Sequence, residues 1–361
     1  MEYQRLGDYI RPVDVRNRDL KVNVSQGICN AKYFQNPKQV ADNPETHKVV
    51  RTGQFAYNRA TTRNGDKISI ALREGPDCTV SSAYQVFEIV DENQLDPKYL
   101  MMWFKRPEFD RLAIFYSHGS AHEFFEWDAM CEVRLPIPTI ARQREIVEEY
   151  ETLSRRIRLN EQMIARLEET AQALYRKMFV DGIDKENLPV GWRRGRLGEV
   201  AVIKAGGDKP KEFSEKKSDI YNIPVYANGI ENKGIFGYTT EPVVTKKSIT
   251  ISARGTIGYC FLRKQPYVPI VRLIVIIPNN EVMTQYLYYY MDSSNIKGSG
   301  SVQSQLTVPD MEDLQILIPS NQIMQEFFDE VEIIDKSIEL REQENEKLTE
   351  LQSLLLARMG K

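Results

Sequence analysis

Apolar residues recur along two segments of the chain at intervals that alternate between three and four residues. The first seam consists of Tyr150, Leu153, Ile157, Asn160, Ile164, Leu167, Ala171 and Leu174, and the second of Val331, Ile334, Ile338, Arg341, Asn345, Leu348, Gln352 and Leu355. Sustained alternation keeps one stripe of a helix facing a partner helix. The pattern therefore predicts two long helices that pair as a coiled coil, with polar seam residues fixing the register. Two solvated helices, each packed on its own domain, are the alternative.

Both helices belong to an internal repeat. Shifted by 181 residues, Gly119–Met178 aligns without a gap on Gly300–Met359, and 16 of the 60 aligned positions are identical. Further upstream, Leu6–Tyr9 (Leu-Gly-Asp-Tyr) is echoed by Leu197–Val200 (Leu-Gly-Glu-Val), at a shift of 191. This period is far longer than that of a solenoid. It indicates two copies of a whole domain, each followed by a helix that at about 35 residues would be a rod of about 50 Å.

The segments outside the long helices carry strand-like runs rich in β-branched and aromatic residues. The predicted strands are Gln54–Asn58, Lys67–Leu72, Tyr84–Val90 and Cys131–Pro138 in the first copy, and Ser248–Ser252, Gly258–Leu262, Val271–Ile277 and Leu314–Pro319 in the second. Short helices are predicted at Pro97–Phe104 and Thr284–Met291, and the first long helix from Glu145 to about Val180. We expect an α+β fold with a lobe at 1–140, a long helix at 141–182, a second lobe at 183–319 and a second long helix at 320–361.

Composition narrows the class of protein. The chain has 361 residues, 42% hydrophobic and 27% charged, without an apolar run that approaches a membrane span or a signal-peptide core. Its four cysteines are far apart and form no Cys-x-x-Cys pair, which fits a reduced, intracellular setting. The formal net charge of −3 argues against wholesale binding of polyanions, but clustered Lys and Arg on one face remain compatible with DNA binding.

No set of catalytic residues is recognisable. The sequence lacks an adenine-methyltransferase tetrapeptide of the Asn-Pro-Pro-Tyr type and a Gly-x4-Gly-Lys-Ser/Thr phosphate loop. A loose nuclease-like pattern at Pro76-Asp77 fails because Val90 stands where a lysine is needed. His118, His122 and Cys131 form no metal site at suitable spacing, and exposed loop histidines with a buried thiol are the favoured interpretation. The sequence therefore favours a binding protein with no metal over an enzyme.

Two polar loops of the first lobe are candidates for DNA contact, namely 58–67 and 117–122. Arginine can bind guanine and asparagine can bind adenine in the major groove, whereas Thr and Lys suit phosphates. The candidate DNA-binding residues of this lobe are Asn58, Arg59, Thr61, Thr62, Arg63, Asn64, Lys67, Ser117, His118, Ser120 and His122. A solvated hairpin loop is the alternative for 58–67.

The second lobe offers loops at 252–258 and 297–305, together with 228–234 and the nearby Tyr238. Glycines in 252–258 permit close approach of a backbone, and the repeat aligns His122 with Gln303, so one position carries different reading groups. The candidate DNA-binding residues are Asn228, Lys233, Tyr238, Ser252, Arg254, Thr256, Lys297, Ser299, Ser301, Gln303 and Gln305. An aromatic stripe on the short helix consists of Tyr286, Tyr288, Tyr289 and Tyr290. These rings can stack on bases, but an aromatic stripe on a short helix more often belongs to the core.

These motifs together resemble the specificity subunit of a type I restriction–modification system, over essentially the whole chain. The resemblance is carried by Gly191-Trp192 with Leu197–Val200, by Tyr226–Ile230, by Ile251–Gly258, by the Gly300–Leu306 loop, and by Ile137-Pro138 and Ile318-Pro319 before the long helices. The first lobe departs from the family pattern, since Asn58–Arg63 stands where Ser-x-Arg-Gly-x-Ile-Gly is expected and His122 where glutamine is expected.

The resemblance implies that each lobe is a target-recognition domain reading one half of a split DNA site. It also implies that the two helices pair antiparallel, related by a pseudo-two-fold repeat, and set the spacer between the halves. Two methyltransferase subunits would dock on this chain and methylate adenine with S-adenosylmethionine bound to them. A translocase–nuclease subunit is a further candidate partner.

The chain itself would then be a non-catalytic protein of the prokaryotic cytoplasm, in defence against foreign DNA. Two alternatives remain. One is a DNA-binding regulator that works without a methyltransferase, and the other is a two-lobe scaffold that binds only protein.

Overall fold

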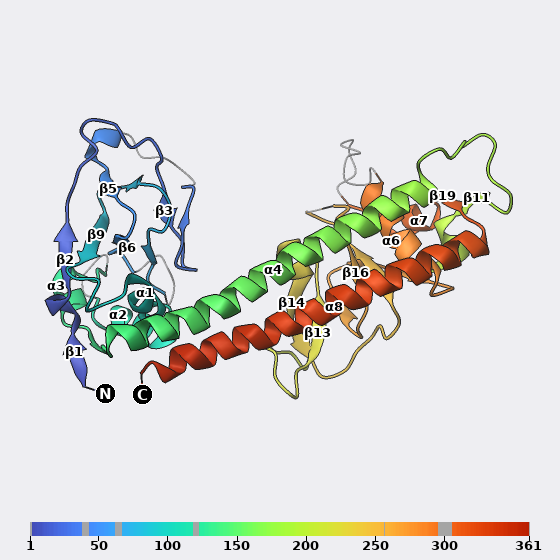
Figure 1. The fold of residues 1–361 in the computed structure, drawn as a ribbon. Helices are drawn as coiled ribbons and strands as arrows, with labels where there is room; N and C mark the ends of the chain where they lie inside the picture. The colour runs from blue at the N-terminus through green and yellow to red at the C-terminus, as the bar shows by residue number, and fades with distance from the viewer. Residues whose placement is uncertain are drawn as a thin grey trace. The chain divides into compact units, whose positions relative to one another are not determined.

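The computed structural model describes residues 2–37, 43–61, 67–117, 123–255, 257–294 and 305–360. It divides into two compact units, one made of Met1–Asn160 with Glu342–Lys361 and the other of Glu161–Arg341. Each unit combines β-sheet, short helices and a segment of both long helices, so the chain is a mixed α and β protein (Figure 1). Within the described residues, no helix is long and apolar enough to cross a membrane.

The first unit is built around an antiparallel sheet with the strand order β2 (Ile10–Val13), β9 (Tyr84–Ile89), β6 (Phe55–Asn58) and β7 (Ile70–Leu72). Alternate residues of a strand face the same side, and Phe55 of β6 lies opposite Phe87 of β9 with ring centroids 4.9 Å apart. Helix α1 (Pro97–Phe104) packs Phe104 edge-on against both rings. The other elements of this unit are β1 (Tyr3–Arg5), η1 (Leu6–Asp8), β3 (Gly27–Ile28), β4 (Phe34–Gln35), η2 (Pro44–Thr46), β5 (Lys48–Val50), β8 (Cys78–Val80), α2 (Pro107–Phe115), α3 (Trp127–Cys131) and β10 (Arg134–Pro136).

The second unit has a four-stranded antiparallel sheet in the order β12 (Ala201–Ala205), β18 (Ile274–Pro278), β15 (Ser248–Ile251) and β16 (Cys260–Arg263). A smaller mixed sheet has the order β14 (Ile235–Thr239), β13 (Ile223–Tyr226) and β17 (Val268–Pro269), with β17 parallel to β13. The other elements are β11 (Arg193–Arg196), α5 (Leu197–Val200), η3 (Glu231–Gly234), α6 (Met283–Ser293), α7 (Val308–Glu312) and β19 (Gln315–Ile318).

Helices α4 (Ile140–Phe179) and α8 (Asn321–Arg358) each contribute a segment to both units. In the first unit Gln352 donates to the Ser154 hydroxyl at 2.6 Å, and Asn160 donates to Asn345 Oδ1 at 2.9 Å, so the two segments run antiparallel. In the second unit the Tyr175 ring of α4 lies 6.2 Å from the Phe327 ring of α8, between centroids. The predicted seam residues of both helices are all buried or half-buried.

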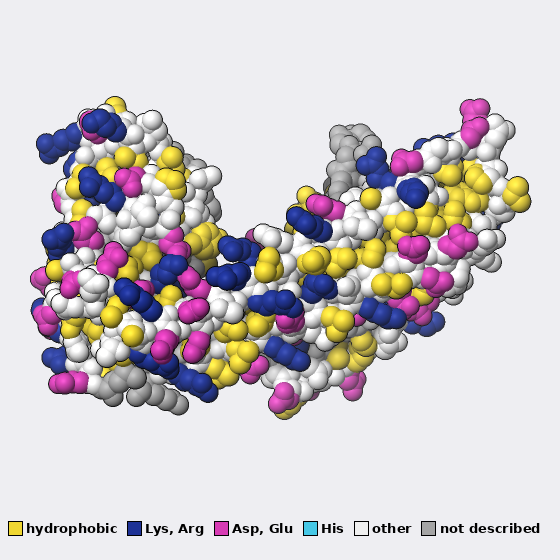
Figure 2. Space-filling view, viewed as in Figure 1, with side chains coloured by type: hydrophobic (Ala, Val, Ile, Leu, Met, Phe, Trp, Pro, Cys, Tyr) yellow, Lys and Arg dark blue, Asp and Glu magenta, His cyan; other side chains and the backbone are white. Residues whose placement is uncertain are grey.

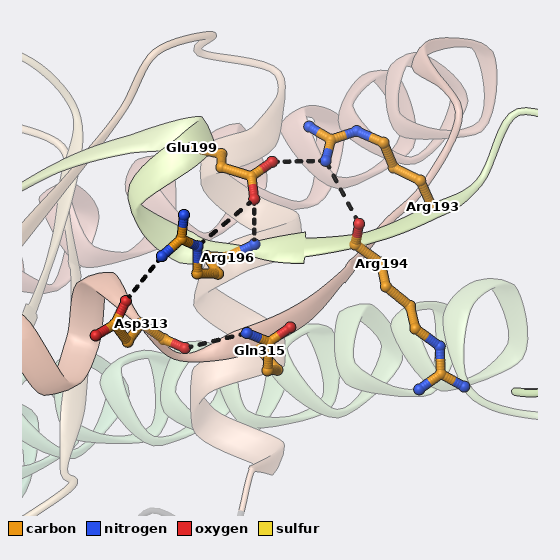
Figure 3. A network of polar contacts seen from close by, with 6 residues as sticks. All are labelled: Arg193, Arg194, Arg196, Glu199, Asp313 and Gln315. Carbon is orange, nitrogen blue, oxygen red and sulfur yellow. Dashed lines mark hydrogen bonds and ion pairs between the residues drawn. The ribbon is translucent and has the colours of Figure 1, made fainter.

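The two units share a set of equivalent contacts. The Leu6 N–H donates to the Val133 carbonyl at 2.8 Å, and the Leu197 N–H donates to the Leu314 carbonyl at 2.9 Å. These residues are related by the sequence shifts of 191 and 181. An arginine in each unit pairs with two acidic residues at equivalent positions. Arg5 pairs with Asp8 and Glu132 in the first unit. Arg196 pairs with Glu199 and Asp313 in the second unit (Figure 3). The repeat in the sequence is therefore a repeat of specific contacts.

Several predicted bounds shift for identifiable reasons. Helix α4 begins at Ile140 instead of Glu145, because the buried Gln143 side chain donates to the Pro138 and Gln94 carbonyls and fixes a first turn. Strand β7 begins at Ile70 instead of Lys67, since the Ile68 N–H donates to the Asp110 carboxylate rather than to a neighbouring strand. Helix α2 was not predicted, and its first residue, Pro107, is a typical start for a helix.

Candidate nucleic-acid interface

Three segments that are distant in sequence meet at one edge of the four-stranded sheet of the second unit. Ile251, the last residue of β15, lies opposite Ile274, the first residue of β18. The loop 252–255 after β15 and the turn 270–273 before β18 therefore emerge at the same edge. A third segment joins them, because the Leu306 N–H donates to the Ala253 carbonyl at 3.0 Å. We use the name sheet edge for 252–255, 270–273 and the segment at Leu306, together with Asn228.

Asn228 holds the sheet edge together with its side-chain amide. Its Oδ1 accepts a hydrogen bond from the Ala253 N–H at 2.7 Å, and its Nδ2 donates to the Val271 carbonyl at 2.8 Å. One amide thus bridges the loop after β15 and the turn before β18. Ser252, which is buried, accepts a further hydrogen bond from the Gly229 N–H at 3.3 Å. Asn228 and Ser252, both predicted to contact DNA, are engaged inside the protein and position the residues beside them.

Arg254 is the predicted reading residue that the loop exposes. Its Nε donates to Gln305 Oε1 at 3.0 Å, so two predicted residues from separate motifs are in direct contact. Gly255 follows at a φ of +67°, a left-handed conformation that glycine adopts without strain. The guanidinium of Arg254 retains donors beyond its Nε, as a bidentate contact with a base requires.

Lys233 and Tyr238 lie together in a second region of this unit. Both line a surface hollow of about 550 Å³. The turn that carries Lys233 is held by Arg263, whose side chain donates to the Lys233 carbonyl at 2.7 Å and lies 3.5 Å from the Tyr226 ring centroid. Burial lowers the pKa of Arg263. The sequence did not single out this arginine, because a buried cation inside a strand leaves no local pattern.

The first unit contains an equivalent junction. The Phe125 N–H donates to the Arg59 carbonyl at 2.9 Å, and Phe125 is related to Leu306 of the second unit by the shift of 181. The Thr61 N–H and hydroxyl both donate to the Glu123 carbonyl, at 3.0 and 3.1 Å. In both units, therefore, the chain that leaves a strand (β6 or β15) meets the segment that precedes a short helix (α3 or α7).

The side chains at this junction differ from those of the second unit. Arg59 forms an ion pair with Glu126 at 3.2 Å, and Asn58 Oδ1 accepts from the Ala60 N–H at 3.1 Å. Lys67 is exposed, whereas Ser117 is buried and donates to the Ala113 carbonyl at 2.7 Å. The backbone contact is common to both units, whereas the polar side chains around it differ.

The remaining predicted DNA-binding residues lie outside the described part of the chain. They are Thr62, Arg63, Asn64, His118, Ser120, His122, Thr256, Lys297, Ser299, Ser301 and Gln303.

The charge distribution agrees with the small net charge. On the face drawn in Figure 2, Lys and Arg side chains are interspersed with Asp and Glu. No group of three or more His, Cys, Asp or Glu side chains in the described residues could hold a metal ion. Tyr286 of the predicted tyrosine stripe is buried, and its hydroxyl donates to the Leu317 carbonyl at 2.5 Å, so this residue belongs to the core.

The chain is similar to known proteins. Residues 189–350 match the family model of the type I restriction modification DNA specificity domain. A Mycoplasma pneumoniae protein described as a type I specificity subunit is 37% identical over 126 residues, which cover 35% of this chain and 38% of that protein. The specificity subunit of the type I restriction enzyme HindI from Haemophilus influenzae is 26% identical over 216 residues, covering 54% of this chain and 47% of that protein. The matched segments thus span about half the length of these relatives or less.

The fold of the chain is also similar to that of a solved structure. The crystal structure of the S subunit of a type I restriction–modification system from M. genitalium aligns with 100% of this chain and 96% of that chain, with a TM-score of 0.60 and 16% sequence identity. The resemblance to type I specificity subunits seen in the sequence is confirmed. Over residues 189–350, the chain is similar to the type I restriction modification DNA specificity domain.

Proposed function

We propose that this protein is the DNA-recognition subunit of a type I restriction–modification complex, and that each lobe reads one half of a two-part DNA site. The observation that carries the proposal is the duplicated junction. Phe125 meets Arg59 in one unit and Leu306 meets Ala253 in the other, through the same backbone hydrogen bond. An arginine lies at each junction, half-buried Arg59 in one unit and exposed Arg254 in the other, while the residues around them differ. Two modules with one scaffold and different polar groups suit two different half-sites.

In this proposal the lobes are residues 1–140 and 183–319, and the long helices 141–182 and 320–361 form an antiparallel coiled coil that sets the spacer. The polar contacts between Ser154 and Gln352 and between Asn160 and Asn345 support a defined register, because each polar group in a seam is satisfied only in one alignment. A fixed register makes the separation of two half-sites reproducible.

We assign catalysis to partner methyltransferase subunits that methylate adenine with S-adenosylmethionine. Leu159 and Leu340 are identical residues at equivalent positions of the repeat, and they are 51% and 67% exposed. These leucines would give the same partner one equivalent apolar contact on each helix. This chain would position DNA by phosphate contacts and read base edges, while adenine is flipped into the partner's pocket, since a stacked base cannot be reached. A translocase–nuclease subunit is a further partner in this proposal.

The proposal is tested by DNA binding of the tagged chain, purified alone and with the subunits that copurify from its source strain. We expect site-specific binding that requires the copurified subunits and weakens as salt rises, because phosphate contacts release counterions. Tight binding of a defined site by the chain alone would favour a regulator that needs no methyltransferase. Absence of salt-dependent DNA affinity in both samples would contradict the proposal and favour a protein scaffold.

A further inference from the structure

The turn before β18 has a backbone conformation that its residues do not prefer. Val271 and Arg272 have φ values of +54° and +62°. Left-handed backbone is uncommon outside glycine, and a β-branched residue there is a genuine outlier. Such strain persists where the surrounding structure over-determines it, and it clusters at functional sites.

The surroundings of this turn hold it firmly. The Val271 N–H donates to the Gly207 carbonyl at 2.9 Å, and the Arg272 N–H donates to the Gly206 carbonyl at 3.2 Å. Asn228 binds the Val271 carbonyl from the other side. A Cβ on Gly206 would lie 2.8 Å from the Ile270 nitrogen, so only glycine permits this approach. Three residues, Gly206, Gly207 and Asn228, therefore hold the turn in its strained form.

The left-handed conformation of the turn does not bury the side chain of either residue. Val271 is 51% exposed and Arg272 is exposed. Within the part of the chain that the structure describes, the Arg272 guanidinium has no hydrogen bond and no ion pair. The turn thus presents the exposed guanidinium of Arg272 on a backbone held by three hydrogen bonds.

Arg272 shares the sheet edge with Arg254. The Asn228 amide binds the residue before each of the two arginines, Val271 and Ala253. A single side chain therefore bridges the two backbone segments that carry these arginines, although 18 positions separate Arg254 from Arg272 in the sequence.

We propose that Arg272 is a second base-reading residue of the second lobe, acting beside Arg254 through a bidentate contact with guanine. The inference rests on the proposed function. A phosphate contact tolerates a mobile side chain, whereas a bidentate contact with guanine O6 and N7 requires an accurately placed fork. A turn that keeps a strained backbone in order to place one exposed guanidinium fits the second requirement.

The test is the pattern of adenine methylation in the source strain when Arg272→Ala replaces the chromosomal allele. A good bidentate contact discriminates against a wrong base by about 5- to 150-fold. We expect methylation at sites altered at one position of one half-site to rise by a factor in this range relative to the intact site. The position should lie in the half-site that Arg254→Ala also affects.

Two further variants separate base reading from other roles. Lys246→Ala removes an exposed charge that precedes β15, at the end of the strand opposite the sheet edge, and should leave discrimination unchanged. Arg272→Lys retains the charge and loses the fork, so it should discriminate as poorly as Arg272→Ala. Restored discrimination in Arg272→Lys, or a uniform loss of methylation in Arg272→Ala that lysine rescues, would assign a phosphate contact and overturn the inference.

Failure of the inference is distinguishable from failure of the proposed function. A two-part motif that depends on the wild-type gene, together with unchanged specificity in Arg272→Ala, overturns only the role of Arg272. A strain whose methylation does not depend on the wild-type gene contradicts the proposed function first, and the role of Arg272 falls with it.

Discussion

Replacement of Asn228 by alanine should loosen the sheet edge of the second unit without unfolding the protein. The change removes the acceptor of the Ala253 N–H and the donor to the Val271 carbonyl. Ala253 is 1% exposed, so its N–H would stay buried without a partner. The loop that carries Arg254 and the turn that carries Arg272 would then move independently.

The size of the effect follows from the two hydrogen bonds. Each is worth about 0.5–1.5 kcal/mol net, and a buried donor left without a partner costs about 1–3 kcal/mol. A local loss of about 1–3 kcal/mol corresponds to a factor of about 5–150 in the population of the open edge. The global free energy of unfolding should change less, because Asn228 is partly exposed and contributes no apolar side chain to the core.

Hydrogen–deuterium exchange followed by mass spectrometry measures this population directly. Peptides that cover 249–255 and 269–274 should exchange faster in Asn228→Ala by that factor, since local opening controls exchange. Asn228→Asp is the matched control, because it keeps an acceptor for Ala253 and loses the donor to Val271. It should retain protection at 249–255 and lose it at 269–274.

Exchange at the junction of the first unit, where Phe125 meets Arg59, should be unaffected in both variants. Wild-type protection of 249–255 in Asn228→Ala would refute the reasoning, since the Ala253 N–H would then not depend on Asn228.

Further predictions concern the buried groups and the long helices. Lys32→Met leaves the Asp110 carboxylate buried without the ammonium that lies 2.7 Å away. The free energy of unfolding of the first unit, measured in urea, should therefore fall by about 3–5 kcal/mol, and a fall below about 1 kcal/mol would show that the pair contributes little. Burial raises the pKa of the Cys78 thiol to about 11, so iodoacetamide at pH 8 should alkylate half-buried Cys29 first and Cys78 only after unfolding, and equal rates by mass spectrometry would contradict the assigned burial. Leu340→Asp should reduce copurification of the partner at unchanged melting temperature, with Lys336→Ala on the same helix as the control; wild-type copurification would remove this residue from the docking surface. Insertion of four residues into both long helices should lengthen the methylated spacer by about 2 base pairs, from about 1.5 Å per residue and 3.4 Å per base pair, and an unaltered spacer would show that the helices do not set it.

The features of the fold that depend on local pattern were predictable from the sequence. Helix α1 has the predicted bounds, because Asp96 caps it, Pro97 starts it and its apolar residues face the core. Contacts equivalent between the units, such as Leu6 with Val133 and Leu197 with Leu314, follow from the repeat that the sequence reveals. These elements are determined by neighbouring residues or by recurrence of the same residues.

Other features depend on contacts that no local pattern encodes. Val271 was predicted to begin a strand, as its β-branched side chain favours, but hydrogen bonds to Gly206, Gly207 and Asn228 hold it in a left-handed turn. The same turn engages the Asn228 side chain within the protein, and its predicted contact with DNA stays a prediction. The sequence did not single out Arg272, because this residue was predicted to lie inside a strand. Its position beside Arg254 depends on the pairing of β15 with β18.

The central claim is that this chain directs methylation to a two-part DNA site, and the most direct test is a map of methylated adenines. Long-read sequencing would compare the source strain with the gene intact and with the gene deleted. The account predicts that one two-part motif, with a fixed spacer, is methylated only when the gene is intact. An identical set of methylated sites in both strains, with the chain demonstrably expressed in the first, would contradict it.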